Sequence, residues 1–203
     1  MEQHENRIVL RGDLLGMPEF SHENHGKKFY RFFLEVPRLS GAVDTLPVVA
    51  ELGLIEELDA LCAERVYVEG QIRSHNHTDE TGRHLMIFVF AQVLRIEDGE
   101  AVNDVTLRGC LCREPTFRRT PLGREICDAM LAVPRAFRRA DYLPCILWGR
   151  TAQEISRCHM RDRIELHGRL QSRIYTKYLG ESCVERTAYE VSALTAAAVD
   201  CPE

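Results

Sequence analysis

The sequence predicts an all-β protein with short helices, built as two successive five-stranded barrels. Three observations lead to this prediction. The chain of 203 residues repeats itself at an interval of about 97 positions. Within each repeat, short stretches rich in β-branched residues alternate between apolar and polar side chains, which is typical of half-buried strands. One stretch with helical spacing falls between the third and fourth strands of each repeat.

The repeat extends over almost the whole chain. With an offset of 97 positions, identical residues align, among them Asn6 with Asn103, Gly12 with Gly109, Arg38 with Arg135, and Asp44 with Asp141. One additional residue in the second helical region changes the offset to 98, which aligns Gly70 with Gly168 and Ser74 with Ser172. A period of this length indicates duplication of a whole domain and not a solenoid.

The elements follow the same order in both repeats. In the second repeat we expect strands at residues 105–112, 126–133, 142–148, 163–177 and 183–191, and a helix at 152–158. In the first repeat, helical spacing precedes a strand at 65–75 and involves Ile55, Leu58, Leu61 and Cys62. Five strands with a helix between the third and fourth is the order of the OB-fold, a small Greek-key barrel. The predicted domains are an OB-fold at residues 1–98 and another at 102–203, with an acidic linker near 97–102.

The charge is distributed unequally between the two predicted domains. Residues 1–100 contain 10 Lys and Arg against 18 Asp and Glu, whereas residues 101–203 contain 16 against 13. A basic surface can therefore be confined to the second domain. Residues 1–6 lack the features of a secretion signal, and the longest apolar run, 85–94, is about half the length of a membrane-spanning helix. We expect a cytoplasmic protein without a membrane partner.

The cysteines and histidines do not form a recognisable site. The eight cysteines are scattered without a CxxC pair, so reduced thiols are expected, and their spacing does not match a zinc site. Several histidines fall near loops of the first domain and are interpreted as exposed loop residues: His22, His25, His75, His77 and His84. The sequence has no Walker loop and no nucleophile motif. We therefore expect neither a metal, nor a cofactor, nor enzymatic activity.

Several motifs resemble the bacterial single-stranded DNA-binding protein family. Residues 66–73, followed by Thr78, Asp79 and Gly82, resemble the fourth strand and hairpin of that family, and residues 145–150 resemble its third strand. The resemblance implies non-catalytic binding of single-stranded DNA in replication, recombination or repair. Family members commonly assemble four OB-folds, which implies a homodimer for a chain that has two. Replication or repair proteins are further expected partners, but residues 199–203 lack the acidic-aromatic tip through which the family recruits them.

The second domain has the chemistry that this function needs. Binding without sequence preference requires a cationic groove for phosphates and aromatic faces for bases. Strand alternation puts Ile164, Leu166, Leu170 and Ile174 toward the barrel interior, and gives the outer face Arg163, Glu165, His167, Arg169, Gln171, Arg173, Tyr175 and Lys177. The resemblance implies that Tyr142 and Trp148 occupy positions of stacking aromatics. It implies the same at or near Tyr175 and Phe137. The expected binding residues are Arg135, Phe137, Arg138, Tyr142, Trp148, Arg150, Arg169, Arg173, Tyr175 and Lys177. An alternative for Trp148 is that it closes the barrel end.

The first domain lacks most of the corresponding aromatics. It has Thr45, Glu51 and His77 where the second domain has Tyr142, Trp148 and Tyr175. Its aromatics concentrate instead at 29–34 and 88–90, runs that predict burial on both strand faces. We interpret this domain as an assembly and scaffolding module with auxiliary contacts through Arg65, Tyr67 and Arg73. Two other functions stay open, namely a protein-interaction platform similar to primosomal accessory proteins, with weak or no nucleic-acid binding, and a metal-dependent hydrolase.

Overall fold

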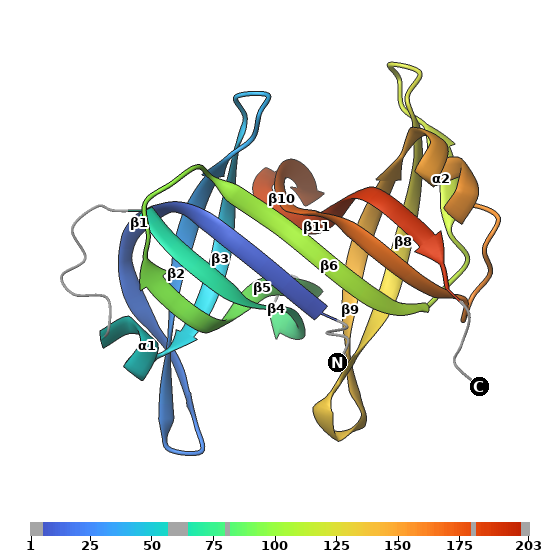
Figure 1. Ribbon diagram of the computed structural model, residues 1–203. Coiled ribbons are helices and arrows are strands. Elements are labelled where there is room, and N and C mark those ends of the chain that lie inside the picture. The colour runs from blue at the N-terminus through green and yellow to red at the C-terminus, as the bar shows by residue number, and fades with distance from the viewer. Residues whose placement is uncertain (1–5, 57–64, 80–81, 180–181, 200–203) are drawn as a thin grey trace.

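The computed structural model describes residues 6–56, 65–79, 82–179 and 182–199, which form two barrels side by side (Figure 1). The first barrel contains β1 (Asn6–Asn24), β2 (Lys27–Pro37), β3 (Val43–Glu51), α1 (Leu52–Glu56), β4 (Arg65–Asp79) and β5 (Gly82–Ile96). Its strands pair in the closed order β1–β2–β3–β5–β4–β1. The pairing of β3 with β5 is parallel and the other pairings are antiparallel.

The second barrel repeats this order. It contains β6 (Val102–Leu111), β7 (Thr116–Arg119), β8 (Glu125–Arg135), the 3-10 turn η1 (Ala136–Arg138), β9 (Arg139–Trp148), α2 (Gly149–Ile155), β10 (Arg163–Leu179) and β11 (Ser182–Ala198). The closed order is β6–β8–β9–β11–β10–β6, and β7 adds to β8. The prediction of two five-stranded barrels with short helices is confirmed.

Some predicted boundaries are wrong. The helix α2 begins at Gly149 and ends at Ile155, not at residues 152–158, because the chain after it turns and the carboxylate of Asp162 accepts a hydrogen bond from the backbone of His159 (2.8 Å). The first strand of the second barrel is interrupted between β6 and β7. The first barrel has a register shift between Leu15 and Glu19 at the same position of its continuous β1. Leu58, Leu61 and Cys62 of the predicted first helix lie outside the described residues.

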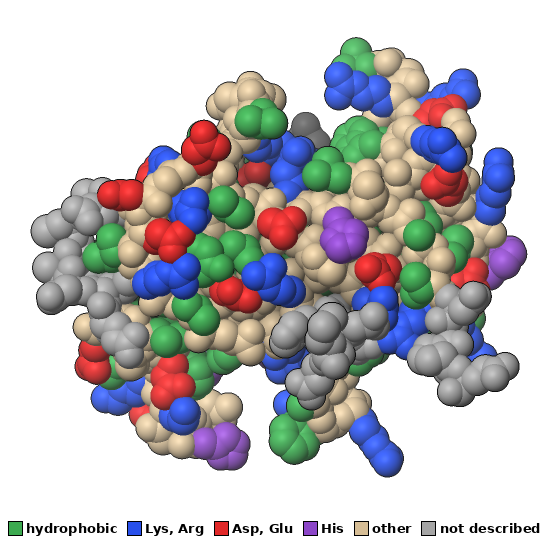
Figure 2. Space-filling model, viewed as in Figure 1, with side chains coloured by type: hydrophobic (Ala, Val, Ile, Leu, Met, Phe, Trp, Pro, Cys, Tyr) green, Lys and Arg blue, Asp and Glu red, His purple; other side chains and the backbone are tan. Residues whose placement is uncertain are grey.

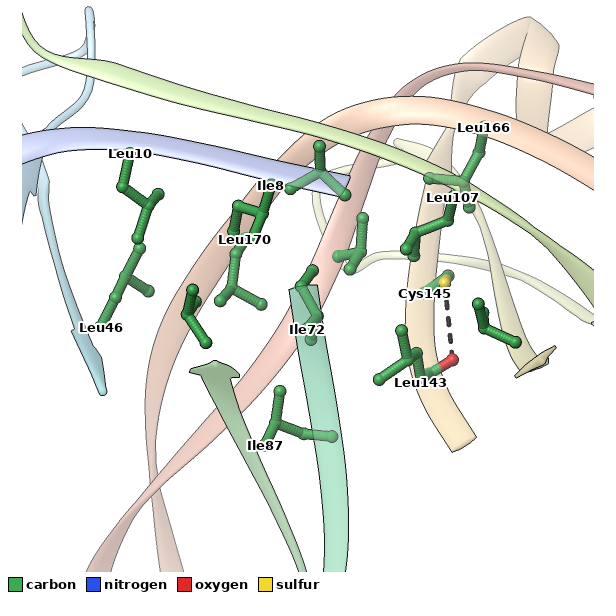
Figure 3. Packing of buried hydrophobic residues seen from close by; sticks show 14 of the residues in the cluster. Ile8, Leu10, Leu46, Ile72, Ile87, Leu107, Leu143, Cys145, Leu166 and Leu170 are labelled. Atoms are coloured by element: carbon green, nitrogen blue, oxygen red, sulfur yellow. Dashed lines mark hydrogen bonds between the residues drawn. The ribbon is translucent and has the colours of Figure 1, made fainter. Parts of the chain in front are cut away.

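The two barrels share one sheet. Strands β1 and β6 pair antiparallel, from Asn6 opposite Leu107 to Arg11 opposite Val102. This pairing joins the described strands into a single 11-stranded sheet. The buried apolar side chains also form one cluster that includes residues of both barrels, such as Ile72 and Leu170 (Figure 3). The tandem barrels are therefore held together by backbone hydrogen bonds and by a common core.

A pair of equivalent polar contacts connects each barrel to the hairpin of the other. The buried carboxylate of Asp44, in β3, accepts a hydrogen bond from the backbone N–H of Ser172, in β10 (2.7 Å). The buried carboxylate of Asp141, in β9, accepts the equivalent bond from Ser74, in β4 (2.7 Å). These four residues occupy matching positions of the sequence repeat. The β4–β5 hairpin thus packs against β9 while the β10–β11 hairpin packs against β3, with an approximate twofold relation between the barrels.

Candidate nucleic-acid interface

Strand β9 places two aromatic side chains on the outside of the second barrel. Leu143, Cys145 and Leu147 point into the core, so the alternation turns Tyr142 and Trp148 outward, where 47% and 37% of their surfaces are exposed. The indole N–H of Trp148 donates a hydrogen bond to Ser192 Oγ (3.1 Å). This bond orients a large aromatic side chain at the surface. Trp148 is too exposed to serve only as a closure of the barrel end.

Strand β10 supplies the neighbouring cations, with two corrections to the predicted alternation. Arg173 and Tyr175 are exposed, and the guanidinium carbon of Arg173 lies 5.8 Å from the centre of the Tyr175 ring. Ile174, predicted to point into the barrel, is 69% exposed because the β10–β11 hairpin extends beyond the barrel. Gln171, predicted to be on the outer surface, is buried and donates to Glu190 (2.8 Å). The side chain of Lys177 lies outside the described residues.

The connection between β8 and β9 presents another aromatic residue. Phe137 is 93% exposed, and both Phe137 (φ 61°) and Arg138 (φ 56°) adopt the left-handed backbone conformation. Such a conformation costs a non-glycine residue about 1 kcal/mol or more, and strained residues cluster at binding sites. The turn therefore holds an aromatic and a basic side chain out from the barrel.

Some of the arginines predicted to bind DNA already form ion pairs with acidic side chains of the protein. Arg150 contacts Glu154 one helical turn further on (2.8 Å), and Arg173 lies 3.8 Å from Glu190. Arg135 contacts the buried carboxylate of Asp141 (3.3 Å). Arg169 is half-buried, and its Nε has no hydrogen-bond partner within the described part of the chain. The outer face of the second barrel is thus cationic, but less strongly than a count of its arginines suggests.

The face seen in Figure 2 carries acidic and basic side chains interspersed over the strands around β1, β4 and β6. On these strands Arg7 pairs with Glu69 (2.8 Å), and Arg108 of β6 pairs with Glu165 of β10. The partner Arg7 holds the pKa of the Glu69 carboxyl below its ordinary value, and Arg108 does the same for Glu165. Charges matched in this way do not give a surface of one sign. These strands therefore do not form a predominantly cationic surface.

A groove of about 1180 Å³ lies between the outer face of the first barrel and the hairpin of the second. Among the residues that the structure describes, no Asp or Glu lines the groove, and five arginines do: Arg31, Arg73, Arg135, Arg139 and Arg186. Of the predicted binding residues, the groove brings together Arg135 and Tyr175. Trp148 and Arg169 lie instead on either side of Ser192 in β11. Arg169 is the residue of β10 opposite Ser192 in the sheet, and the indole of Trp148, from β9, donates a hydrogen bond to Ser192 Oγ.

The first barrel contributes to this groove through β2, which the sequence pattern does not predict. Phe29, Arg31 and Phe33 recur at every second position of β2, so they share the outer face, while Phe32 and Leu34 face the core. The sequence predicts burial on both faces for residues 29–34, whereas Arg31 is exposed and Phe33 is half-buried. The alternation of Phe, Arg and Phe was the available signal, because an arginine at the centre of a fully buried face would be costly.

No group of three or more His, Cys, Asp or Glu residues in the described part of the chain is placed to hold a metal ion. None of the helices described is long and apolar enough to span a membrane. The surface of the second barrel presents aromatic faces and guanidinium groups, which suit stacking and contact with anions.

Closed five-stranded barrels with a helix between the third and fourth strands define an OB-fold protein. A single-stranded DNA-binding protein from Thermus aquaticus has the same fold, with a TM-score of 0.79 over 98% of this chain and 94% of that one, at 22% identity. Residues 102–198 match the Single-strand binding protein family. Single-stranded DNA-binding protein B of Bacillus subtilis is 35% identical over 80 residues, which is 36% of this chain and 71% of that protein. The chain belongs to the single-strand binding protein family.

The similarity to other members covers a smaller share of their length. Single-stranded DNA-binding protein 1 of Lactococcus lactis is 32% identical over 87 residues, which is 39% of this chain and 58% of that protein. The chain thus spans a little more than half of this relative.

Proposed function

We propose that this protein binds single-stranded DNA, largely without sequence preference and without catalysing a reaction. The observation that carries the proposal is the set of exposed aromatic side chains, Tyr142, Trp148 and Tyr175, beside arginines on the outer strand faces of an OB-fold of this family. The relatives that match the chain are named as single-stranded DNA-binding proteins. The DNA would serve in replication, recombination or repair.

In this proposal bases stack on the aromatic faces and phosphates contact the guanidinium groups. Stacking tolerates any base because every base has a π-face, and each stacked base contributes roughly 1–3 kcal/mol. The hydrogen bond from Trp148 to Ser192 orients the indole before DNA arrives, which lowers the entropic cost of binding. The cations of the second barrel complete the proposed site, together with Phe137; they are Arg135, Arg138, Arg150, Arg169, Arg173 and Lys177.

We further propose that the chain works as a homodimer in the cytoplasm, with replication or repair proteins as partners. Two copies would supply four OB-folds, because each chain contains two closed barrels. Sedimentation of the full chain at several concentrations checks this, and a monomer at micromolar concentration would contradict it.

A titration of the full chain with oligothymidine tests the proposed binding. Trp148 is the only tryptophan, so a base stacked on it should quench the fluorescence of the protein. If about four phosphates are contacted, the logarithm of affinity should fall against the logarithm of salt concentration with a slope near −3, from about −0.7 per phosphate. Duplex DNA should bind more weakly. Absence of quenching together with a slope near zero would contradict the proposal and favour the interaction platform.

Substitutions distinguish stacking from a structural role for the same aromatics. Trp148→Ala and Tyr175→Ala should each weaken binding of fluorescein-labelled oligothymidine by roughly 1–3 kcal/mol, measured by anisotropy. Phe20→Ala is the control, since Phe20 is exposed but belongs to β1 of the first barrel. If both substitutions left affinity unchanged and lowered only the melting temperature, these aromatics would be structural.

A further inference from the structure

A carboxylate lies among the aromatic side chains on the outer face of the second barrel. Strand alternation puts Glu190 on the same side of β11 as Ser192, which accepts the hydrogen bond from the indole of Trp148. The guanidinium Nε of Arg173 lies 3.8 Å from Glu190 Oε1, and the guanidinium carbon of Arg173 lies 5.8 Å from the centre of the Tyr175 ring. The carboxylate is therefore situated between two of the aromatic residues on which bases are proposed to stack.

The barrel fold does not require a carboxylate at this position. Glu190 is opposite Gln171 in the pairing of β10 with β11. The equivalent pair of the first barrel, which also begins three residues after the aligned glycine of its strand, is Arg73 opposite Phe88. The same fold thus accepts an apolar residue there. A negative charge beside the phosphates of DNA is unfavourable, so neither the fold nor phosphate binding explains Glu190.

One oxygen of this carboxylate is left for a ligand. Glu190 Oε1 accepts a hydrogen bond from the side-chain amide of Gln171 (2.8 Å) and also makes the contact with Arg173. Within the described part of the chain, Oε2 accepts no hydrogen bond. The side chain keeps 16% of its surface exposed, so a ligand can reach it. A hydrogen bond to a charged acceptor that is shielded from water in this way is stronger than one between neutral groups.

The pyrimidine bases differ in what they offer to a carboxylate. Cytosine carries an amino group at C4, which donates hydrogen bonds, and glutamate is one of the side chains that accept from it. Thymine and uracil carry a carbonyl oxygen at the same position, which is an acceptor and is repelled by a carboxylate. The rings of these bases have the same size, so stacking on an aromatic side chain distinguishes them far less.

We propose that Glu190 gives the bound strand a base preference, because its carboxylate accepts a hydrogen bond from the amino group of cytosine and disfavours the C4 carbonyl of thymine or uracil. This inference rests on the proposed function. Gln171 fixes the carboxylate through Oε1, which leaves Oε2 for the base. Stacking still holds every base, so the preference is one of degree and is added to binding that is largely independent of sequence.

Two homopolymers test the proposal on the full wild-type chain. Oligodeoxycytidine and oligodeoxyuridine of about 15 nucleotides differ at the hydrogen-bonding edge of the base, and both lack the methyl group of thymine. In anisotropy titrations with fluorescein-labelled strands at about pH 8, the cytidine strand should bind about fivefold or more tightly than the uridine strand. Equal affinities would overturn the inference and leave the proposed function intact. If neither strand bound, the proposed function would fail and the inference with it.

Glu190→Gln tests whether the preference comes from this carboxylate. Glutamine has nearly the same shape and keeps an oxygen that can accept from Gln171, but it places an amide N–H group where Oε2 was. The ratio of the two affinities should therefore fall to about one or below, since the amide can donate to the carbonyl of uracil. The ratio is taken within one protein, so a loss of stability does not change it. A variant that kept the wild-type ratio would overturn the inference.

Asp128→Asn is the matched control. Asp128 is another carboxylate on the outer face of the second barrel, since its neighbours Cys127 and Ala129 are buried, but both of its oxygens accept hydrogen bonds from Arg118. The substitution removes the same charge, so it should change both affinities by the same factor and leave their ratio within about twofold of the wild-type value. A change of ratio as large as that in Glu190→Gln would show that the ratio reports charge and not a hydrogen bond to the base, and the inference would be wrong.

Discussion

At the scale of single residues, Gly12 and Gly109 are required by close approach of neighbouring strands. A Cβ atom at Gly12 would lie 2.5 Å from the carbonyl oxygen of Glu35, and one at Gly109 would lie 2.6 Å from that of Ala132. Both contacts are with backbone atoms, which cannot move away as a flexible side chain does. The two glycines align in the sequence repeat because each occupies the same crossing of strands in its barrel.

Gly109→Ala should therefore lower the free energy of unfolding by about 1–3 kcal/mol, the usual cost of overpacking. Urea denaturation followed by circular dichroism measures the change. The control is Gly53→Ala, because a Cβ atom at Gly53, in α1, would meet nothing within 4 Å. Alanine is a better helix former than glycine, so the control should be neutral or slightly stabilising. Equal stabilities of the two variants would contradict the packing argument.

The buried thiol of Cys127 makes the free energy of unfolding depend on pH in the alkaline range. Burial raises the pKa of this thiol to about 11, with smaller contributions from Asp128 and Cys158. The folded protein keeps the thiol protonated, while in the unfolded chain it ionises at its ordinary value near 9. Its contribution to stability is complete below pH 9 and is lost as the pH rises toward 11. The free energy of unfolding should fall across this window, and the fall should be smaller in Cys127→Ala. An identical pH profile for both proteins would exclude this role.

At the scale of elements, the two hairpins are tied to the opposite barrel by equivalent carboxylates. Besides the backbone of Ser74, the carboxylate of Asp141 binds Arg73 of the first barrel (3.0 Å). The carboxylate of Asp44 binds Arg38 of its own barrel (2.6 Å) as well as the backbone of Ser172. Each hairpin position is therefore set by a buried, fully partnered charge.

Asp141→Ala should lower the free energy of unfolding by about 3–5 kcal/mol, because it leaves buried cationic and N–H partners without their acceptor. Asp104→Ala, at an exposed position of β6, serves as the control and should change stability by less than about 0.5 kcal/mol. Thermal unfolding of both variants beside the wild type measures the difference. A loss of less than about 1 kcal/mol for Asp141→Ala would show that the hairpin contact contributes little to stability.

At the scale of the whole molecule, the shared sheet and the common core predict one unfolding transition. The β1–β6 pairing and the buried cluster connect both barrels, so opening one of them exposes apolar surface of the other. Denaturant curves followed by Trp148 fluorescence, which reports on the second barrel, and by circular dichroism, which reports on both, should coincide. Two separated midpoints would mean that the barrels unfold independently.

The sequence was sufficient for the barrel order, but less so for the candidate site. Tyr142 and Trp148 lie on the predicted outer face of β9, since alternation is a local property of a strand. Ile174 does not follow its predicted orientation, because β10 continues past the end of the barrel that would have covered it. The arginine-lined groove was not predicted. The scaffolding role assigned to the first domain stays a prediction.

The two OB-folds, their strand order and the family of the chain can all be read from the amino-acid sequence. These properties follow from periodicity and from a repeat of residues such as Asp44 and Asp141, which can be read without knowing what they touch. The pairing of β1 with β6, and the position of Phe33 and Phe88 opposite the hairpin of the second barrel, become visible only in the folded molecule. Such contacts join residues far apart in the chain, and they depend on how two complete barrels pack, which no local pattern encodes.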